Sequence, residues 1–276
     1  MNIDKDFFEA SLSFAMHPDE SIYNAMAPYL NEEFTRIQNN LLGIVVALTI
    51  DDGNHEELDV AVGNLTCLSA ICRHLRGLDL VLTENGFGIV SNTNIAPASQ
   101  QRVDALLQEC LNNFDFATDR VLDLLIATPD WFSTRQAQSS IATLFEMRRF
   151  LHEYAGMSDG TGSHDAWIKA KRLSFEADII VRDLISSAQM DALLLMERYH
   201  TEAKPIADAP AWAIELIRRF IGSYIAGNKD DNILNDLYNY MEANLDAFPE
   251  YAASAQYKAN HYADYQNTEE SSAFFF

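Results

Sequence analysis

One long apolar stripe, over residues 97–127, sets the strongest limit on how this chain can fold. Its apolar members are Val103, Leu106, Leu107, Cys110, Leu111, Phe114, Val121, Leu122 and Leu125. A side chain returns to the same face of an α-helix after about 3.6 residues, so these residues form one apolar face of a long helix. A helix of this kind needs partners that cover its apolar face. The stripe therefore predicts a bundle of packed helices.

The same period recurs along most of the chain and predicts further helices. The expected ranges are residues 21–41, 58–77, 141–154, 167–185, 190–199, 210–227 and 230–245, after a short amphipathic segment within residues 1–18. Pro28 is expected to kink or split its helix, and Gly43, Gly77 and Gly227 are expected to end theirs. The chain has only 11 Gly and 7 Pro in 276 residues, which favours long helices over an all-β fold.

The stretch from Leu78 to Pro97 is the one strong β signal. Leu78, Leu80 and Leu82 alternate with Asp79, Val81 and Thr83, and Asn85-Gly86 supplies two residues suited to a type I′ turn. This turn would pair Glu84 with Phe87, Leu82 with Ile89 and Val81 with Val90. A lone hairpin is only marginally stable in water. We therefore expect it either to pack on helices of its own chain or to pair with another subunit through Asn85, Gly86 and Phe87.

The length of the chain favours more than one packed unit. We expect an N-terminal helical unit with the hairpin over residues 1–128, a C-terminal helical unit over 139–250, and an extended docking tail over 251–276. The expected fold class is mainly α: a helical bundle, with two similar helical units as one alternative, one β-hairpin near residues 78–91 and the extended tail. The tail ends in Phe274, Phe275 and Phe276, which would either dock on a neighbour or fold back onto the same chain.

The charge balance limits the partners of this protein. There are 41 acidic and 19 basic residues, a net charge of −22, which argues against binding nucleic acid or an anionic membrane through basic side chains. It suits a soluble protein beside which DNA slides without sticking. The acidic start MNIDKDFF does not resemble a signal peptide, and the apolar run from Ile44 to Ile50 is too short to span a bilayer. We expect a protein made and used in water, with no membrane partner.

No catalytic, cofactor or metal signature is present in the sequence. Cys67, Cys72 and Cys110 fall at apolar helical positions, without CxxC spacing, and suggest reduced core thiols. The His residues form no HExxH pair, and the Gly-rich loop at residues 156–163 lacks the features of a phosphate-binding loop; His164 is expected to be a loop polar group near a helix N-cap. The basic clusters, expected as solvated helix faces or as partners of a neighbouring subunit, are Arg148-Arg149, Lys169-Lys171-Arg172 and Arg218-Arg219. We therefore expect a protein that is not an enzyme and has no cofactor.

Two segments resemble one protein family. LVLTENGFGIVSNTNIAPASQQRVDALL, from Leu80 to Leu107, resembles the pattern LTxxGFGVVS…NxAPAS…RV…L of proteins from tailed phages and prophages of gut bacteria. YMEANLDAFPEYAASAQY, within Leu237 to Tyr257, resembles their YLExN…FPE(W/Y)…S…Y segment. The two segments occur in the same order and cover about a fifth of the chain. The family is that of head–tail connector or adaptor proteins of the phage neck.

This resemblance implies a virion structural protein that forms a homo-oligomeric ring. The ring would join the portal to the tail, contact portal and tail or neck proteins, and continue a channel through which DNA passes without sequence-specific binding. Such a protein would be assembled in the host cytoplasm and would reside in the virion neck. The chain is longer than the usual connector, as a duplicated helical unit would be. The alternatives are a helical adaptor or other capsid- or neck-associated protein that forms no ring, and an enzyme whose site carries no recognisable motif.

Overall fold

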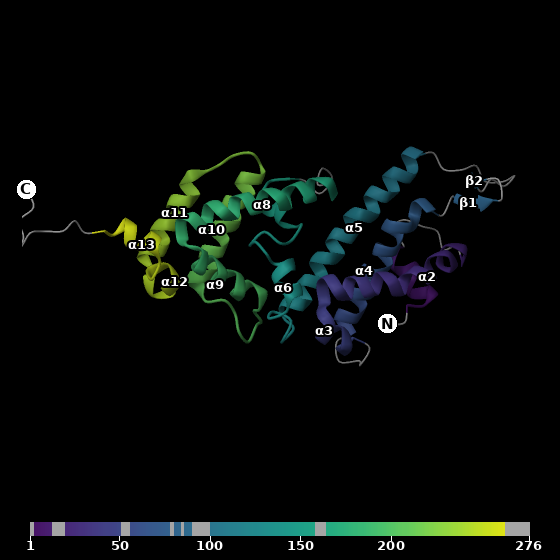
Figure 1. Cartoon of the computed structure of the whole chain (residues 1–276), viewed down its shortest axis with the longest axis horizontal. Helices are drawn as coiled ribbons and strands as arrows, with labels where there is room; N and C mark the ends of the chain where they lie inside the picture. Colours follow the sequence, from purple (N-terminus) through teal and green to yellow (C-terminus); the bar gives the residue numbers. More distant parts are fainter. Residues whose placement is uncertain are drawn as a thin grey trace, which may run out of the picture.

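The computed structural model describes residues 3–12, 20–50, 56–77, 80–83, 86–89, 100–157 and 164–262. The fold is mainly α, a helical bundle, which confirms the predicted class. Figure 1 shows an elongated molecule in which helices α1 to α5 occupy one end and helices α8 to α13 the other. Over these ranges, no helix is both long and apolar enough to cross a membrane.

The N-terminal half is organised around two antiparallel helices. Helix α4 (Glu56–His74) packs along α5 (Gln100–Ile126) and also against α2 (Glu20–Ile37). Most residues of α4 between Leu58 and Ile71 are buried, as its apolar stripe predicts. The remaining elements of this half are α1 (Lys5–Ser11), the π-helical turn η1 (Gln38–Leu42), α3 (Gly43–Thr49) and the 3₁₀ turn η2 (Leu75–Gly77).

Helix α2 continues through Pro28 and ends in the π turn η1, directly before Gly43. Gly43 has a φ of +77°, so the predicted helix end at this glycine is confirmed. Two side chains from a distant segment bond the backbone of the turn. The Trp131 indole donates to the Leu41 carbonyl at 2.8 Å, and the Gln136 amide donates to the Asn39 carbonyl at 2.9 Å. These bonds satisfy carbonyl groups that a regular helix would have paired internally.

Two short strands, β1 (Leu80–Thr83) and β2 (Gly86–Ile89), form an antiparallel pair in the region of the expected hairpin. Their register differs from the expected one, because Leu80 pairs with Ile89 and Thr83 with Gly86. The pairing of Leu82 with Ile89 is therefore wrong, and Gly86 lies in the strand instead of the turn. Register is weakly specified in a glycine-rich strand, and β2 reads GFGI. Pattern alone therefore did not fix this register.

The C-terminal half contains the helices α8 (His164–Ile185), α9 (Ser187–Arg198), α10 (Asp208–Ile225) and α11 (Asp231–Ala243). Helix α8 packs against α9, α10 and α11. Short helices precede and follow this group: α6 (Arg135–Ser140), α7 (Phe150–Glu153), the 3₁₀ turn η3 (Leu245–Ala247), α12 (Pro249–Ala252) and α13 (Ala255–Asn260).

The expected extended tail does not begin at residue 251. Residues up to Asn260 are helical, and Tyr251 is fully buried. The backbone N–H of Tyr251 donates to the Gln189 side chain at 3.1 Å, and its hydroxyl donates to Glu242 at 2.6 Å. Pro249 at the first turn of α12 and Ser254 capping α13 explain these two short helices. Residues 263–276, including the expected docking residues Phe274 to Phe276, lie outside the described part of the chain.

The buried apolar side chains form two clusters. The smaller joins α1, α2, α4 and α5 and includes Phe8, Met26 and Ile71. The larger begins at α3, α4 and the end of α5, passes through Trp131 and continues into the C-terminal helices. One core thus contains side chains from both sides of the expected boundary at residues 129–138, and the division into units 1–128 and 139–250 stays a prediction.

The segment from residue 141 to 149 is a buried, irregular connection, and the predicted helix over 141–154 is wrong except for α7. Its apolar residues, including Ile141, Leu144 and Phe145, are fully buried, which explains why their spacing resembled a helical stripe. Side chains on other helices bond several groups of this backbone, namely the Ile141 and Leu144 carbonyls and the N–H groups of Arg148 and Arg149. This segment therefore connects α9 and α10 to the core.

Candidate functional site

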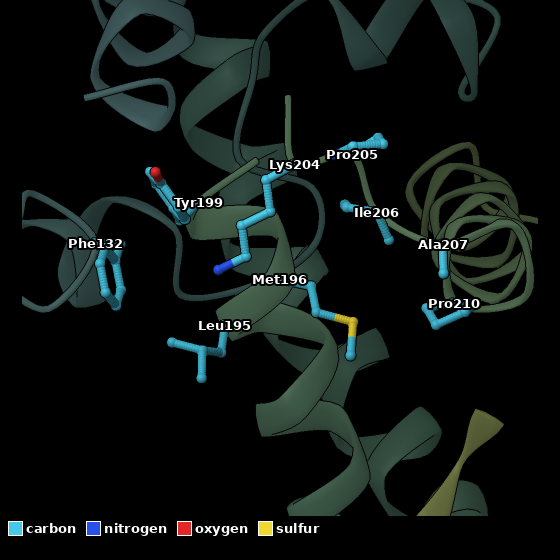
Figure 2. A pocket seen from close by; sticks show the side chains of 9 residues that line it. All are labelled: Phe132, Leu195, Met196, Tyr199, Lys204, Pro205, Ile206, Ala207 and Pro210. Carbon is cyan, nitrogen blue, oxygen red and sulfur yellow. The ribbon is translucent and has the colours of Figure 1, made fainter. Parts of the chain in front are cut away.

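A hollow lies where α9 ends and α10 begins, and we call it the α9–α10 groove. It has a cavity volume of about 320 Å³, at the lower end of the range of small-ligand pockets. Figure 2 shows Phe132 on one side of it, Ile206, Ala207 and Pro210 on the other, and Leu195 and Met196 of α9 between them. The full lining is Phe132, Leu195, Met196, Tyr199, Lys204, Pro205, Ile206, Ala207 and Pro210.

The local sequence explains why the chain turns at this place. Helix α9 stops at Arg198, and Thr201 and Lys204 exchange backbone hydrogen bonds of 3.0 Å in a tight turn. Pro205 then prevents the residue before it from entering a helix, and Pro210 occupies the first turn of α10. The resulting connection runs across the end of α9 and forms one wall of the groove.

Two aromatic rings line the opposite side, and the connection contributes one cation, Lys204. The rings of Phe132 and Tyr199 lie 5.1 Å apart between centroids, a packing distance for aromatic pairs. The Lys204 ammonium lies 4.9 Å from the centre of the Tyr199 ring, a cation–π arrangement. Figure 2 shows this side chain reaching down toward Met196, so the groove is apolar with a single positive charge. Such a surface suits an apolar or aromatic segment that carries negative charge.

A buried ion network holds the two helices that form the groove. Arg218 of α10 contacts Glu197 of α9 at 2.6 Å and Glu146 of the irregular segment at 3.0 Å. The same guanidinium donates to the Leu144 carbonyl at 2.9 Å and stacks 4.4 Å from the centre of the Phe150 ring. Arg218 therefore fixes α9, α10 and the connecting segment relative to one another.

Two further side chains fix the irregular segment to its neighbours. Arg198, the last residue of α9, donates twice to the Ile141 carbonyl, at 3.0 and 3.1 Å. Asp119 of α5 accepts the backbone N–H groups of Arg148 and Arg149, at 2.9 and 3.0 Å. The groove is thus anchored through this segment to α5, the longest helix described.

Burial shifts the acidity of the carboxylates in this network. Burial raises the pKa of Glu146 to about 7, against the opposing effect of the Arg218 charge. Burial likewise raises the pKa of Asp119 to about 6, although two backbone N–H groups favour its ionised form. One oxygen of Glu146, Oε2, is buried without a hydrogen-bond partner in the described structure. These carboxylates are enclosed within the fold and do not line the groove.

Large apolar side chains are also exposed outside the groove. Ile168, Phe175 and Ile179 project from one stripe of α8, and Ile179 is 60% exposed. On α3, Ile44 and Leu48 lie one turn apart, and Leu48 is 76% exposed. These stripes are candidate contact surfaces for other proteins.

The residues predicted to bind partners are only partly described. Gly86 and Phe87 belong to β2, while Asn85 and the Phe274–Phe276 tripeptide lie outside the described residues. The assignment of Asn85, Gly86, Phe87, Phe274, Phe275 and Phe276 to partner contacts stays a prediction.

The expectation that the basic clusters lie on solvated helix faces is wrong for Arg148 and Arg218, whose side chains are largely buried. Arg148 is buried, with its guanidinium 4.3 Å from the centre of the Phe116 ring, and Arg149 forms a bidentate pair with Asp123 at 2.6 and 2.8 Å. Arg218 is the centre of the network described above. Arg149 and Arg218 pair with carboxylates of the same chain, and the Arg148 guanidinium donates to Asn112. The sequence pattern could not distinguish such pairing from pairing with a neighbour.

His164 begins α8, as expected of a residue near a helix N-terminus, and its Nδ1 lies 2.9 Å from the buried Asp115 carboxylate. Across the described ranges, no group of three or more His, Cys, Asp or Glu side chains is placed to hold a metal ion. Burial raises the pKa of Cys67 and Cys72 to about 12 and that of Cys110 to about 11, and all three thiols are free. Cys67 and Cys110 are buried and Cys72 is partly buried, and the raised pKa disfavours the reactive thiolate form of all three.

The groove itself was missed by sequence reasoning, although two signals were available. The run from Leu193 to Met196 is apolar at four successive positions, so it must place apolar side chains on both faces of α9. Leu193 and Leu194 are buried, while Leu195 and Met196 are exposed. The paired prolines at 205 and 210 mark the connection that forms the wall beside them.

The fold and these surfaces define a mainly α-helical bundle protein with an internal ion network and exposed apolar faces. The chain belongs to a family of unknown function, DUF6712, whose model matches residues 22–141 and 226–261. The matched residues contain both Leu80–Leu107 and Leu237–Tyr257, and the groove lies largely in the interval between the two matched stretches. The search of curated proteins found no match, and neither did the search of solved structures.

Proposed function

We propose that this protein is a virion structural protein, a head–tail connector or adaptor that forms a ring between the portal and the tail and continues the DNA channel. The observation that carries the proposal is that large apolar side chains are exposed on several separate elements, α3, α8 and α9. The resemblance of Leu80–Leu107 and Leu237–Tyr257 to neck proteins is the reason for proposing a ring in the phage neck in particular. In this role the protein has no catalytic step and no cofactor.

The energetics favour contacts on more than one face. Burying one large apolar side chain contributes about 1.5–3 kcal/mol, and the three side chains of the α8 stripe are roughly half exposed, so covering them contributes on the order of 3 kcal/mol. Association costs an estimated 4–15 kcal/mol in lost freedom of motion. One stripe is therefore insufficient, whereas a subunit in a ring covers surfaces on two neighbours at once.

The arrangement of the elements fits a head-to-tail interface. Strands β1 and β2 lie at one end of the molecule and helix α13 at the other (Figure 1). Two different surfaces that meet repeatedly produce a closed ring when the rotation between subunits closes. The net charge of −22 repels the DNA backbone, which suits a channel through which DNA slides.

Electron microscopy of the purified full chain, alone and mixed with the portal protein of the phage or prophage that encodes it, tests the proposal. Closed rings, either free or seated on the portal, are the expected particles. Single copies in both samples would contradict the ring. A stoichiometric complex of single copies with another virion protein would instead favour the adaptor without a ring.

A further inference from the structure

We infer that the α9–α10 groove is the receptor for residues 263–276 of a neighbouring copy of this chain. The inference rests on the proposed ring and names the contact that would close it. The groove belongs to the described structure, and its occupant is the C-terminal segment that the described residues do not include.

The chemistry of the segment complements that of the groove. Residues 263–276 read ADYQNTEESSAFFF, with three acidic side chains, Asp264, Glu269 and Glu270, and no Lys or Arg. Tyr265 and the Phe274–Phe276 tripeptide supply aromatic anchors, which dominate the energetics of many protein interfaces. The groove offers the apolar surface of Leu195, Met196 and Ile206 and the single positive charge of Lys204.

The accessibility of the groove fits a binding role. Leu195 is 51% exposed, and Met196 and Lys204 are exposed as well. Lys204 contacts the Tyr199 ring and forms no ion pair with a carboxylate among the described residues. With 41 acidic and 19 basic residues, copies of this chain repel one another. A lysine at an apolar groove attracts an acidic segment locally, against that repulsion.

The length of the segment allows it to reach another molecule. Fully extended, residues 263–276 span about 45 Å, more than twice the length of α9, which is about 18 Å. The segment follows α13, and the preceding helix α12 is fixed to α9 through Gln189, near the N-terminal end of α9. The groove lies at the opposite end of α9. An outgoing segment and a separate receptor on each copy form a heterologous contact, which is the kind that closes a ring.

Complementary variants of the full chain provide the test. The groove variant Leu195→Glu keeps its own segment intact, and the segment variant replaces Phe274, Phe275 and Phe276 by Ser and keeps its groove intact. Leu195 is exposed on α9 and Glu is a good helix former, so the groove variant is expected to fold. Equal melting temperatures within a few degrees establish that both variants are folded.

Mass photometry of each variant alone and of an equal mixture is the measurement. We expect the unmodified chain to form the ring, each variant alone to be a single copy, and the mixture to form a two-copy complex. The complex forms because the intact segment of one variant enters the intact groove of the other. A mixture that remains single copies, with each variant alone also single, shows that the intact segment does not enter the intact groove of another copy and overturns the inference.

Charge reversal supplies a matched control. Lys204→Glu is expected to weaken the two-copy complex at least tenfold, whereas Lys229→Glu, at an exposed lysine between α10 and α11, is expected to leave it unchanged. Equal effects of the two reversals would overturn the role of Lys204.

Rings that persist in both the groove and the segment variants overturn the inference while the proposed ring stands. Failure of the unmodified chain to form any oligomer overturns the proposed ring itself.

Discussion

Replacing Arg218 by Met should destabilise the protein by about 3–5 kcal/mol near pH 8, because it removes one partner of a buried ion network. The Glu146 side chain is fully buried and that of Glu197 is 7% exposed, so neither charge can be rehydrated without opening the fold. The Leu144 carbonyl also loses its donor. For a chain of this size, such a change corresponds to a fall in melting temperature on the order of 10 °C.

The adjacent Arg219 provides the matched control. It pairs with Glu215 one helical turn away at 2.8 Å, and its side chain is 49% exposed. An exposed pair of this kind contributes up to about 1 kcal/mol. Arg219→Met should therefore cost much less than Arg218→Met, although both substitutions change the same residue type on the same helix. Urea unfolding followed by circular dichroism measures both.

The pH dependence of Arg218→Met gives a second signature. The folded pKa of Glu146 lies above its ordinary value of 4.5, at about 7, so its protonation stabilises the folded state. That contribution is complete below about pH 4.5 and is lost as the pH rises through about 7. Removing the Arg218 charge raises this pKa further, so the deficit of the variant should shrink between pH 8 and pH 5.5. Adding Glu146→Gln should restore part of the stability at pH 8.

Two results would refute this reasoning. One is a cost of Arg218→Met no larger than that of Arg219→Met. The other is a deficit that does not change with pH and is not reduced by Glu146→Gln. Either result would mean that the network does not hold α9 and α10 in place.

The remaining predictions concern the core. Asp119→Ala leaves one buried and one partly buried backbone N–H group without an acceptor and should cost about 2–4 kcal/mol in urea unfolding. Asp104→Ala, at an exposed pair on the same helix, should cost less than about 1 kcal/mol. Equal costs would contradict the role of Asp119. Gly222→Ala should lower the melting temperature sharply, because the added Cβ would lie 2.5 Å from the Tyr154 backbone. Gly77→Ala is the control, since no atom of the described residues outside its chain neighbours lies within 4 Å of the Cβ added there. An unchanged melting temperature for Gly222→Ala would contradict this packing. The thiols of Cys67 and Cys110 are buried, that of Cys72 is partly buried, and all three have a raised pKa. They should react slowly with a thiol reagent in the native protein at pH 8 and fully after unfolding. Rapid native labelling would show that these helices open.

Apolar periodicity predicted those helices whose partners lie on other regular helices. Helix α4 buries the stripe from Leu58 to Ile71, and α10 ends before Gly227, which has a φ of +85°. In these elements the backbone hydrogen bonds are internal, so the sequence of the element itself determines its structure. Side chains of neighbouring helices then only have to cover the apolar face of the helix.

The same reasoning failed for residues 141–149, where the backbone is bonded by distant side chains. Asp119, Arg198 and Arg218 come from three different helices, and no pattern within the segment records their approach. For the same reason the arginines were expected at the surface. The groove could not be predicted because its walls, Phe132, Leu195 and Ile206, come from segments that lie far apart in the sequence.

The native mass of the full chain, measured over a range of concentrations and with the portal protein present, tests the central claim most directly. One copy has a mass of 31.1 kDa. The ring predicts a dominant species at a fixed whole-number multiple of that mass, free or added to the portal. A mass of 31.1 kDa under every condition would contradict it.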